Sequence, residues 1–135
     1  MVLVNSTKNT VVCDRAHFAN SVFKRMIGLL NRRAFAEGEG LLIDRCYCIH
    51  TVGMRFSIDV LFLDKELRVM RAVQALPPFR TCIVKRAVYV LELPVGAVGR
   101  SRTAAGDQIQ MKAMGSDATT NHNAVSPEKA QAGLR

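Results

Sequence analysis

The sequence predicts an α+β domain that is mainly β, a small barrel-like antiparallel or mixed sheet with one substantial helix. Several short segments of apolar and β-branched residues are separated by turn formers, and only one segment has helical spacing. No regular alternation of strands and helices runs along the chain, which argues against a doubly wound parallel sheet. A chain of 135 residues with 49% hydrophobic content ordinarily folds as one domain. We expect that domain to span residues 1–114.

The first elements expected are two short strands over residues 2–4 and 10–13, which the turn formers between them join as a hairpin. A helix is expected over residues 15–30, because apolar residues recur at three- and four-residue spacing from Phe18 to Leu29. Asp14 can cap the start of this helix. The acidic, glycine-containing segment 37–40 then predicts a loop, and residues 41–43 begin a new strand.

The second half of the chain predicts strands over residues 58–63, 67–73, 87–93 and 108–112. The polar residues 64–66 should join the first two as an antiparallel hairpin, whereas Pro77 and Pro78 break the chain before the third. The last strand alternates apolar and polar residues, so it should be half buried. Beyond Met114 the composition turns small and polar, which predicts a disordered tail over residues 115–135.

The net charge of +8 belongs to residues 1–112, because the remainder carries equal numbers of basic and acidic residues. Such a surplus attracts nucleic acid, anionic lipid or an acidic partner, but the basic residues are scattered without a long run. Nucleic acid is therefore the less favoured partner. No apolar run is long enough to cross a bilayer and no secretory signal begins the chain, so we expect a soluble, cytoplasmic monomer. Four cysteines are too few and too spread out to predict a disulfide framework.

Residues 49–64 read Ile-His-Thr-Val-Gly-Met-Arg-Phe-Ser-Ile-Asp-Val-Leu-Phe-Leu-Asp, the central one of four ordered blocks that resemble a known family. The others are Gly28-Leu29-Leu30, the segment Val-Leu-Glu-Leu-Pro-Val-Gly over residues 90–96, and Gly106-Asp107. Together they resemble the bacterial and archaeal domain of unknown function 192 (DUF192, or UPF0127-like). Ser57 departs from the pattern, which usually has proline there. The resemblance implies a small β-rich domain with no established activity, cofactor or partner.

Two groups of residues carry the candidate chemistry, one with possible metal ligands and one with two carboxylates. If residues 46–50 are extended, Cys46, Cys48 and His50 share one face, and thiolate and imidazole are ligands that zinc or copper prefers. A cysteine pair two residues apart on a straight strand spreads its sulfurs widely, however, and buried cysteine is a common core residue. We predict no cofactor and no metal site, and leave a site at Cys46, Cys48 and His50 as the alternative.

Asp59 and Glu92 are carboxylates within apolar strands, so both should be at least half buried. A buried carboxylate must be hydrogen-bonded, paired or protonated. Arg55 is the nearest pairing candidate for Asp59, and backbone N–H groups are the alternative. Two such carboxylates can also form a general acid and base, as hydrolases require.

These residues lead to three functional hypotheses. The first is a non-enzymatic module that binds a small polar ligand or a peptide. Its expected binding residues are His50, Thr51, Met54, Arg55, Asp59, Glu92 and Asp107. The second is a hydrolase-type enzyme that uses Asp59, Glu92 and His50. The third is a basic accessory factor that contacts nucleic acid or an acidic partner.

Overall fold

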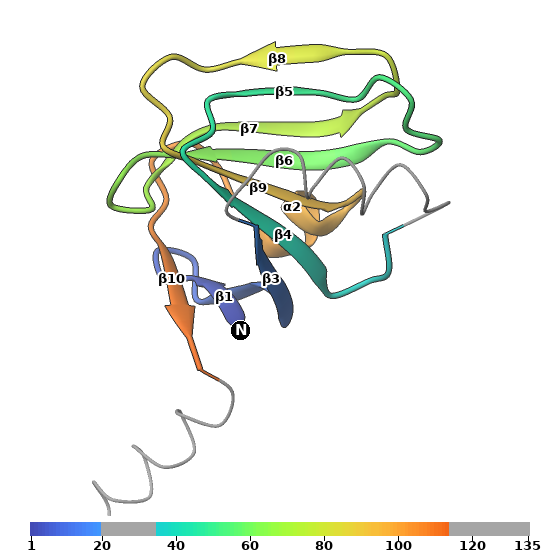
Figure 1. Cartoon of the computed structure of the whole chain (residues 1–135). Helices are drawn as coiled ribbons and strands as arrows, with labels where there is room; N and C mark the ends of the chain where they lie inside the picture. Colours follow the sequence, from blue (N-terminus) through green and yellow to red (C-terminus); the bar gives the residue numbers. More distant parts are fainter. Residues whose placement is uncertain (20–34, 114–135) are drawn as a thin grey trace, which may run out of the picture.

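The computed structural model describes residues 1–19 and 35–113, which form short strands and one short helix (Figure 1). In chain order the elements are β1 (Val2–Asn5), β2 (Thr10–Cys13), β3 (Arg15–Ala19), β4 (Glu39–Asp44), β5 (Cys48–His50), β6 (Ile58–Leu63), β7 (Val69–Leu76), β8 (Thr81–Ile83), β9 (Tyr89–Pro94), α2 (Ala97–Ser101) and β10 (Ile109–Lys112). No helix within these ranges is long and apolar enough to cross a membrane.

A five-stranded mixed sheet in the order β3-β4-β9-β6-β7 forms the centre of the fold. The pair β3–β4 is parallel, and the other neighbours are antiparallel. All six residues of β6 are buried, because this strand is nearly continuously apolar and lies between β9 and β7. Its alternate side chains belong to two core clusters: Leu61 and Leu63 to one, Val60 and Phe62 to the other.

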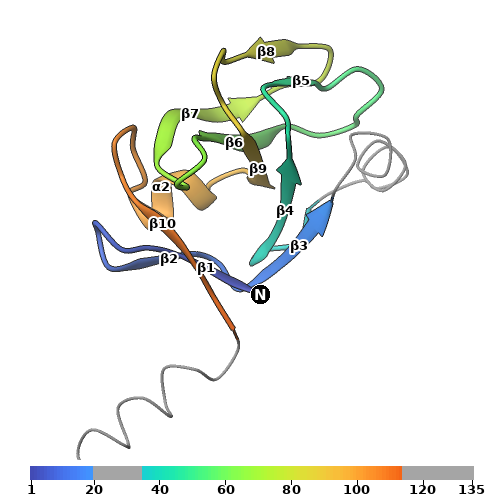
Figure 2. The ribbon, with the colours of Figure 1, turned by 60° about the vertical axis from the view of Figure 1, so that its left-hand side comes forward.

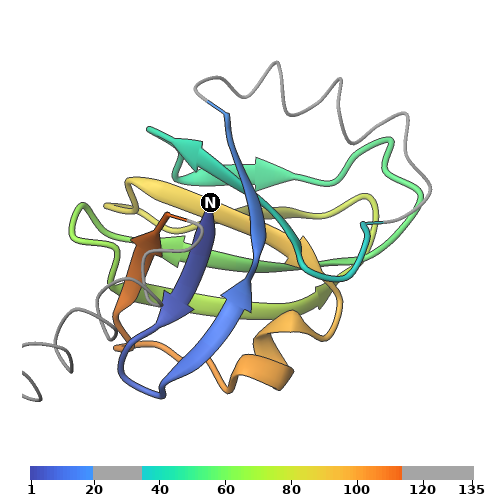
Figure 3. The same cartoon turned by 90° about the horizontal axis from the view of Figure 1, so that it is seen from below.

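The β1, β2 and β10 strands form a second sheet that covers the first core cluster. Leu3 and Ile109 contribute buried side chains from this sheet, and Val98 contributes one from α2. Figure 3 shows the sheet from below, with α2 beside it. The strand order β10-β1-β2 places the first strand of the chain beside the last described strand.

Strands β5 and β8 form a separate two-stranded sheet, which we call the β5–β8 ribbon. Ile49 and Cys82 face each other across it, and both belong to the second core cluster. The ribbon therefore covers the opposite face of the central sheet from α2, as Figure 2 shows.

The predicted class, α+β and mainly β, is confirmed, and the sheet at its centre is mixed. The strands expected over residues 2–4, 10–13, 41–43, 58–63, 67–73, 87–93 and 108–112 correspond to β1, β2, β4, β6, β7, β9 and β10. Both expected hairpins are antiparallel. In β10, Ile109 is buried and Met111 is largely exposed. The short strand β8 and the short helix α2 were not predicted, and an extended conformation at β5 was considered only as a possibility.

The helix expected over residues 15–30 is wrong at its beginning, because Arg15–Ala19 is the strand β3. Its backbone pairs in parallel with β4, from Arg15 opposite Glu39 to Ala19 opposite Ile43. The buried residues Ala16 and Ala19 are three apart, a spacing that a helix would also give, so the sequence pattern was ambiguous here. The rest of this segment and the expected tail over residues 115–135 lie outside the described residues.

Candidate functional site

Thr51 ties together two loops at one end of the β5–β8 ribbon. Its side chain is fully buried, and its hydroxyl donates a hydrogen bond of 2.6 Å to the Pro77 carbonyl and accepts one of 2.9 Å from the Arg80 N–H. The Thr51 backbone N–H donates to the Arg80 carbonyl at 2.8 Å, and its carbonyl accepts from the Phe79 N–H at 3.1 Å. The polar groups of Thr51 therefore hold the 77–80 loop in place.

Phe79, in this loop, has its side chain 67% exposed. Its backbone has φ +62°, in the left-handed region that costs a bulky residue conformational energy. The hydrogen bonds to Thr51 from Phe79 and Arg80 stabilise this conformation. Val52, next to Thr51 and 52% exposed, adds a second apolar side chain at the same end of the ribbon.

The opposite end of the ribbon also exposes apolar side chains. Tyr47 and Ile83 are 55% and 54% exposed, and the Val84 N–H donates to the Tyr47 carbonyl at 2.9 Å. The ribbon and the loops that flank it, residues 45–57 and 77–88, contain no aspartate or glutamate. Their basic residues are Arg45, Arg55, Arg80, Lys85 and Arg86, all exposed. We call these basic residues and the apolar Tyr47, Val52, Phe79 and Ile83 the ribbon surface.

Other residues of the expected site divide between this surface and the interior. His50 lies in β5 opposite Thr81 and is partly exposed, and Arg55 is exposed in the following loop. Met54 is buried in the second core cluster. Of the expected site residues between positions 50 and 55, only His50 and Arg55 are therefore at least partly exposed.

Asp59 is fully buried, as expected, and its carboxylate binds backbone groups. One oxygen accepts the Ala75 N–H at 2.9 Å, and the other accepts the N–H groups of Gly96 and Val98 at 3.1 and 3.0 Å. Arg55, the pairing candidate, is exposed and is not its partner. Gly96 has φ +98° and makes no side-chain cap, so Asp59 takes the place of a capping residue at the start of α2.

Glu92 is also fully buried, but it projects from the opposite face of the central sheet. In the β6–β9 register, Glu92 lies opposite Val60 and Leu93 lies opposite Asp59. Directly opposite residues share a face and successive residues alternate. The carboxylates of Asp59 and Glu92 therefore do not converge on one pocket, and the expected acid–base pair does not form.

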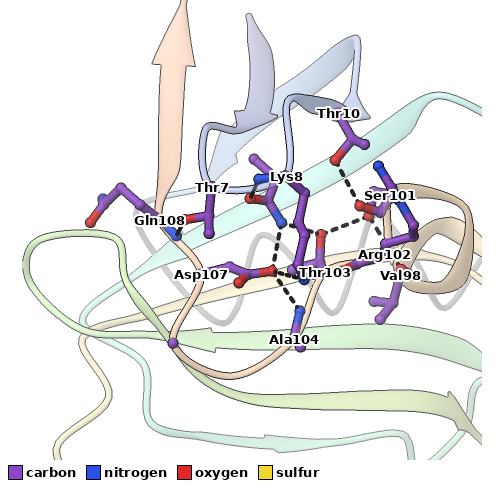
Figure 4. A network of polar contacts seen from close by, with 12 residues as sticks. Thr7, Lys8, Thr10, Val98, Ser101, Arg102, Thr103, Ala104, Asp107 and Gln108 are labelled. Carbon is purple, nitrogen blue, oxygen red and sulfur yellow. Dashed lines mark hydrogen bonds and ion pairs between the residues drawn. The ribbon is translucent and has the colours of Figure 1, made fainter.

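Asp107 lies apart from the other candidates, in a polar network between the small sheet and the end of α2 (Figure 4). Its carboxylate accepts hydrogen bonds from Lys8 Nζ at 2.8 Å, Asn5 Nδ2 at 2.9 Å and the Ala104 N–H at 3.0 Å. Burial by itself raises the pKa of this carboxyl, but these donors outweigh it and lower the pKa to about 2. Asp107 is thus an ionised structural anchor.

The four cysteines all lie within the described residues, and none of them forms a disulfide. Cys46 is buried in the second core cluster and its Sγ lies 3.2 Å from the Cys48 carbonyl, whereas Cys48 is partly exposed. Within the described ranges no three His, Cys, Asp or Glu side chains lie together as metal ligands would, so Cys46, Cys48 and His50 do not form the alternative site. Burial also raises the pKa of the Cys13 thiol to about 11.

Sequence reasoning missed the apolar half of the ribbon surface. Tyr47, Val52, Phe79 and Ile83 are ordinary core-type residues in a sequence, and only the fold reveals that they are exposed. The alternation of exposed Thr81 and Ile83 with the more buried Cys82 and Val84 is visible only in the structure, because the sequence does not alternate polar and apolar residues there. A groove of 330 Å³ on the small sheet, lined by Val4, Thr10, Val11 and Gln110 among others, was likewise not predicted.

The fold is a small mainly-β domain that buries Asp59 and Glu92 on opposite faces of its central sheet, and comparison with known proteins identifies its family. The sequence profile of DUF192, described as "Uncharacterized ACR", matches residues 2–111. A UPF0127 protein of Pyrococcus horikoshii is 34% identical over 113 residues, which cover 81% of this chain and 97% of that protein. A UPF0127 protein of Pyrococcus abyssi is 31% identical over 116 residues, 81% of this chain and 96% of that protein. The chain belongs to the DUF192 family.

Two crystal structures share the fold at a TM-score of 0.69. One is a protein of unknown function from Novosphingobium aromaticivorans, 19% identical, with 82% of each chain covered. The other is described as a putative transcription regulator from Sinorhizobium meliloti, 23% identical, with 81% of this chain and 89% of that chain covered. At these identities the likeness concerns the fold alone.

Proposed function

We propose that the protein is a non-enzymatic binding module that recognises a peptide segment of a protein partner through the ribbon surface. The observation that carries this proposal is four large exposed apolar side chains, two at each end of a short ribbon whose exposed charges are all basic. Several exposed apolar groups on one short element mark interaction sites more often than a single one does. Tyrosine, phenylalanine and arginine are also the residue types enriched where binding energy concentrates.

The fixed backbone at Phe79 supports the same proposal. A loop whose backbone is already held in its binding conformation loses less conformational entropy when a partner docks. Thr51 holds the Phe79 backbone through buried hydrogen bonds, so the ring is exposed without depending on a mobile loop. The module would thus present an aromatic anchor beside basic side chains.

The hydrolase hypothesis receives no support from the arrangement of its candidate residues. Asp59 uses both carboxylate oxygens to accept backbone N–H groups, and Glu92 projects from the other face of the sheet. A general acid and base must both reach one substrate. A role for Asp59 in holding α2 therefore fits better than a catalytic one.

Nucleic acid is the second candidate partner, because exposed Tyr47 and Phe79 stand near arginines, and bases stack on aromatic rings. Against it, Val52 and Ile83 add aliphatic surface, whereas nucleic-acid interfaces are more polar than protein interfaces. A cytoplasmic location fits the described cysteines, which form no disulfide with one another. The basic ribbon surface also fits a monomer, since two copies would repel one another there.

Selection from a library of random short peptides displayed on phage tests the proposal. We expect enrichment of sequences that combine aspartate or glutamate with valine, isoleucine or phenylalanine. Phe79→Ser should weaken binding of a selected peptide at least about tenfold, as loss of an interface anchor does. Phe18→Ser is the matched control, because Phe18 is an exposed phenylalanine on β3 and lies outside the ribbon surface.

Two results would contradict the proposal. One is the absence of any enriched peptide whose binding depends on Phe79. The other is tight binding of a single-stranded oligonucleotide, weakened steeply by salt and by Phe79→Ser, which would assign the surface to nucleic acid.

A further inference from the structure

The hydrogen-bond pattern of the ribbon determines which backbone groups of β8 point outward. The Val84 N–H donates to the Tyr47 carbonyl at 2.9 Å, and the Thr51 N–H donates to the Arg80 carbonyl at 2.8 Å. Hydrogen-bonded pairs alternate with non-bonded pairs in an antiparallel ladder, so the pair between them that bonds is Ile49 with Cys82. The N–H and C=O groups of Thr81 and Ile83 therefore point away from β5, toward the outer edge of β8.

This outer edge of β8 is open within residues 1–19 and 35–113. No strand of these ranges pairs with it, and the side chains of Thr81 and Ile83 are exposed. Figure 1 shows β8 at the margin of the fold. The other edge of the ribbon differs, because the Cys48 carbonyl accepts a contact from Cys46 Sγ at 3.2 Å. Open strand edges readily accept another strand.

We infer that the partner peptide binds as an added β-strand along the outer edge of β8, an inference that rests on the proposed function. The N–H and C=O groups of Thr81 and Ile83 are spaced as a strand-addition site requires, two residues apart on one edge. Phe79 and Ile83 lie along the same segment, where they contact alternate side chains of the added strand. Main-chain bonds supply part of the affinity and these apolar contacts supply specificity.

Charge identifies the chemistry of the occupant. Arg80, Lys85 and Arg86 flank the open edge, and no acidic residue lies between positions 77 and 88. If β8 paired with β8 of a second copy, the basic residues at both ends of the segment would bring positive charges of the two copies close together, which is unfavourable. The occupant is therefore a segment of another protein in which aspartate or glutamate alternates with apolar residues.

The test uses a pool of short peptides in which aspartate or glutamate alternates with valine, isoleucine or phenylalanine. A matched pool carries N-methyl groups at alternate amides, which removes main-chain donors and keeps the side chains. We expect the first pool to protect the Thr81 and Ile83 amides from hydrogen exchange, and the N-methylated pool to bind at least about tenfold more weakly.

Ile83→Pro tests the outer edge of β8 by a change in the protein, where N-methylation changed the peptide. The Ile83 N–H points outward, so proline removes a donor for the partner without removing a bond within the ribbon. Binding should fall at least about tenfold in this variant. Ile83→Thr, which also loses the apolar side chain but keeps the N–H and the strand preference, is the matched comparison, and Ile83→Pro should bind the pool at least about tenfold more weakly than Ile83→Thr. Circular dichroism establishes that both variants are folded.

The outcomes separate the two proposals. If Phe79→Ser weakens binding but N-methylation and Ile83→Pro do not, the ribbon surface binds peptides and strand addition is wrong. If no peptide binds in a way that depends on Phe79, both proposals fail. A dimer detected by light scattering, abolished by Ile83→Pro, would show that the occupant of the edge is a second copy of the chain.

Discussion

Asp59 shows how much one buried carboxylate can organise. Its three backbone donors come from the end of β7 and the start of α2, residues far apart in sequence. Its burial could be predicted from the apolar residues on both sides of it in β6. Its partners could not, because they are main-chain groups whose positions depend on long-range folding.

Replacing Asp59 tests this role. Asp59→Asn removes the charge and turns an NH₂ group toward at least one backbone donor, so it should lower the free energy of unfolding by about 1–3 kcal/mol. Asp59→Ala leaves three buried N–H groups without an acceptor and should cost more. Urea denaturation measures both. Arg55→Ala should leave stability nearly unchanged, because Arg55 is exposed; a loss equal to that of Asp59→Asn would instead reveal an ion pair between them.

Asp107 should make the stability of the folded protein depend on pH in the acid range. Its pKa is lowered to about 2 in the folded state, against about 3.9 in an unfolded chain. A lowered folded pKa contributes stability above the unfolded value, and that contribution is lost as the pH falls through the folded value. Between about pH 4 and pH 2 the wild type should therefore lose the stability that the ionised Asp107 carboxylate contributes. The Asp107→Asn variant lacks this carboxylate and should not show that loss.

Denaturation of both proteins across this range measures the difference. The two stability curves should approach each other as the pH falls. Asp14→Asn is the control, because Asp14 is 65% exposed and lies outside the Lys8–Asn5 network. A constant gap between wild type and Asp107→Asn down to pH 2 would contradict the lowered pKa.

Two glycines, one in a strand of the central sheet and one in the helix α2, differ in their surroundings. A Cβ atom at Gly40, in β4, would lie 2.7 Å from Cys13 Sγ and 3.3 Å from a Leu93 methyl carbon. A Cβ atom at Gly99, in α2, would meet its nearest neighbour, Gln74 Oε1, at 3.6 Å. Close packing therefore requires glycine at position 40, whereas position 99 has room for a Cβ atom.

Gly40→Ala and Gly99→Ala should consequently change stability in opposite directions. We expect Gly40→Ala to destabilise the fold by about 1–3 kcal/mol, since the buried Cys13 and Leu93 must move. Gly99→Ala should stabilise it by up to about 1 kcal/mol, because alanine favours the helix. Thermal denaturation distinguishes them. Equal melting temperatures for the two variants would mean that β4 tolerates the extra carbon.

The elements also show where sequence patterns become ambiguous. The strands β6 and β7 were predictable because a continuous apolar run and a polar turn precede a second apolar run. The segment 15–19 was not, because its apolar residues fit helical spacing and only pairing with β4 makes it a strand. The three-residue strand β8 follows two prolines and precedes Lys85 and Arg86, so local signals there indicate a loop.

For the whole molecule, composition predicted the class but not the location of the binding surface. The sequence shows a basic chain, whereas only the fold brings Arg45, Arg55, Arg80, Lys85 and Arg86 around one ribbon. It likewise places Asp59 and Glu92 on opposite faces, although their sequence environments are alike. Which side chains share a face of a sheet depends on the register between neighbouring strands, and that register is set only when the sheet assembles.

The pairing of β1 with β10 affects how the protein folds during its synthesis. The described residues of the second core cluster, from Ala19 to Val90, are all present once residue 90 has been made. The first cluster needs Ile109, and Val2 cannot meet its partner Lys112 until almost the whole domain has been translated. Until β10 has been made, Leu3 and the rest of this cluster stay exposed to water. Slow translation near residue 112 would therefore prolong dependence on chaperones.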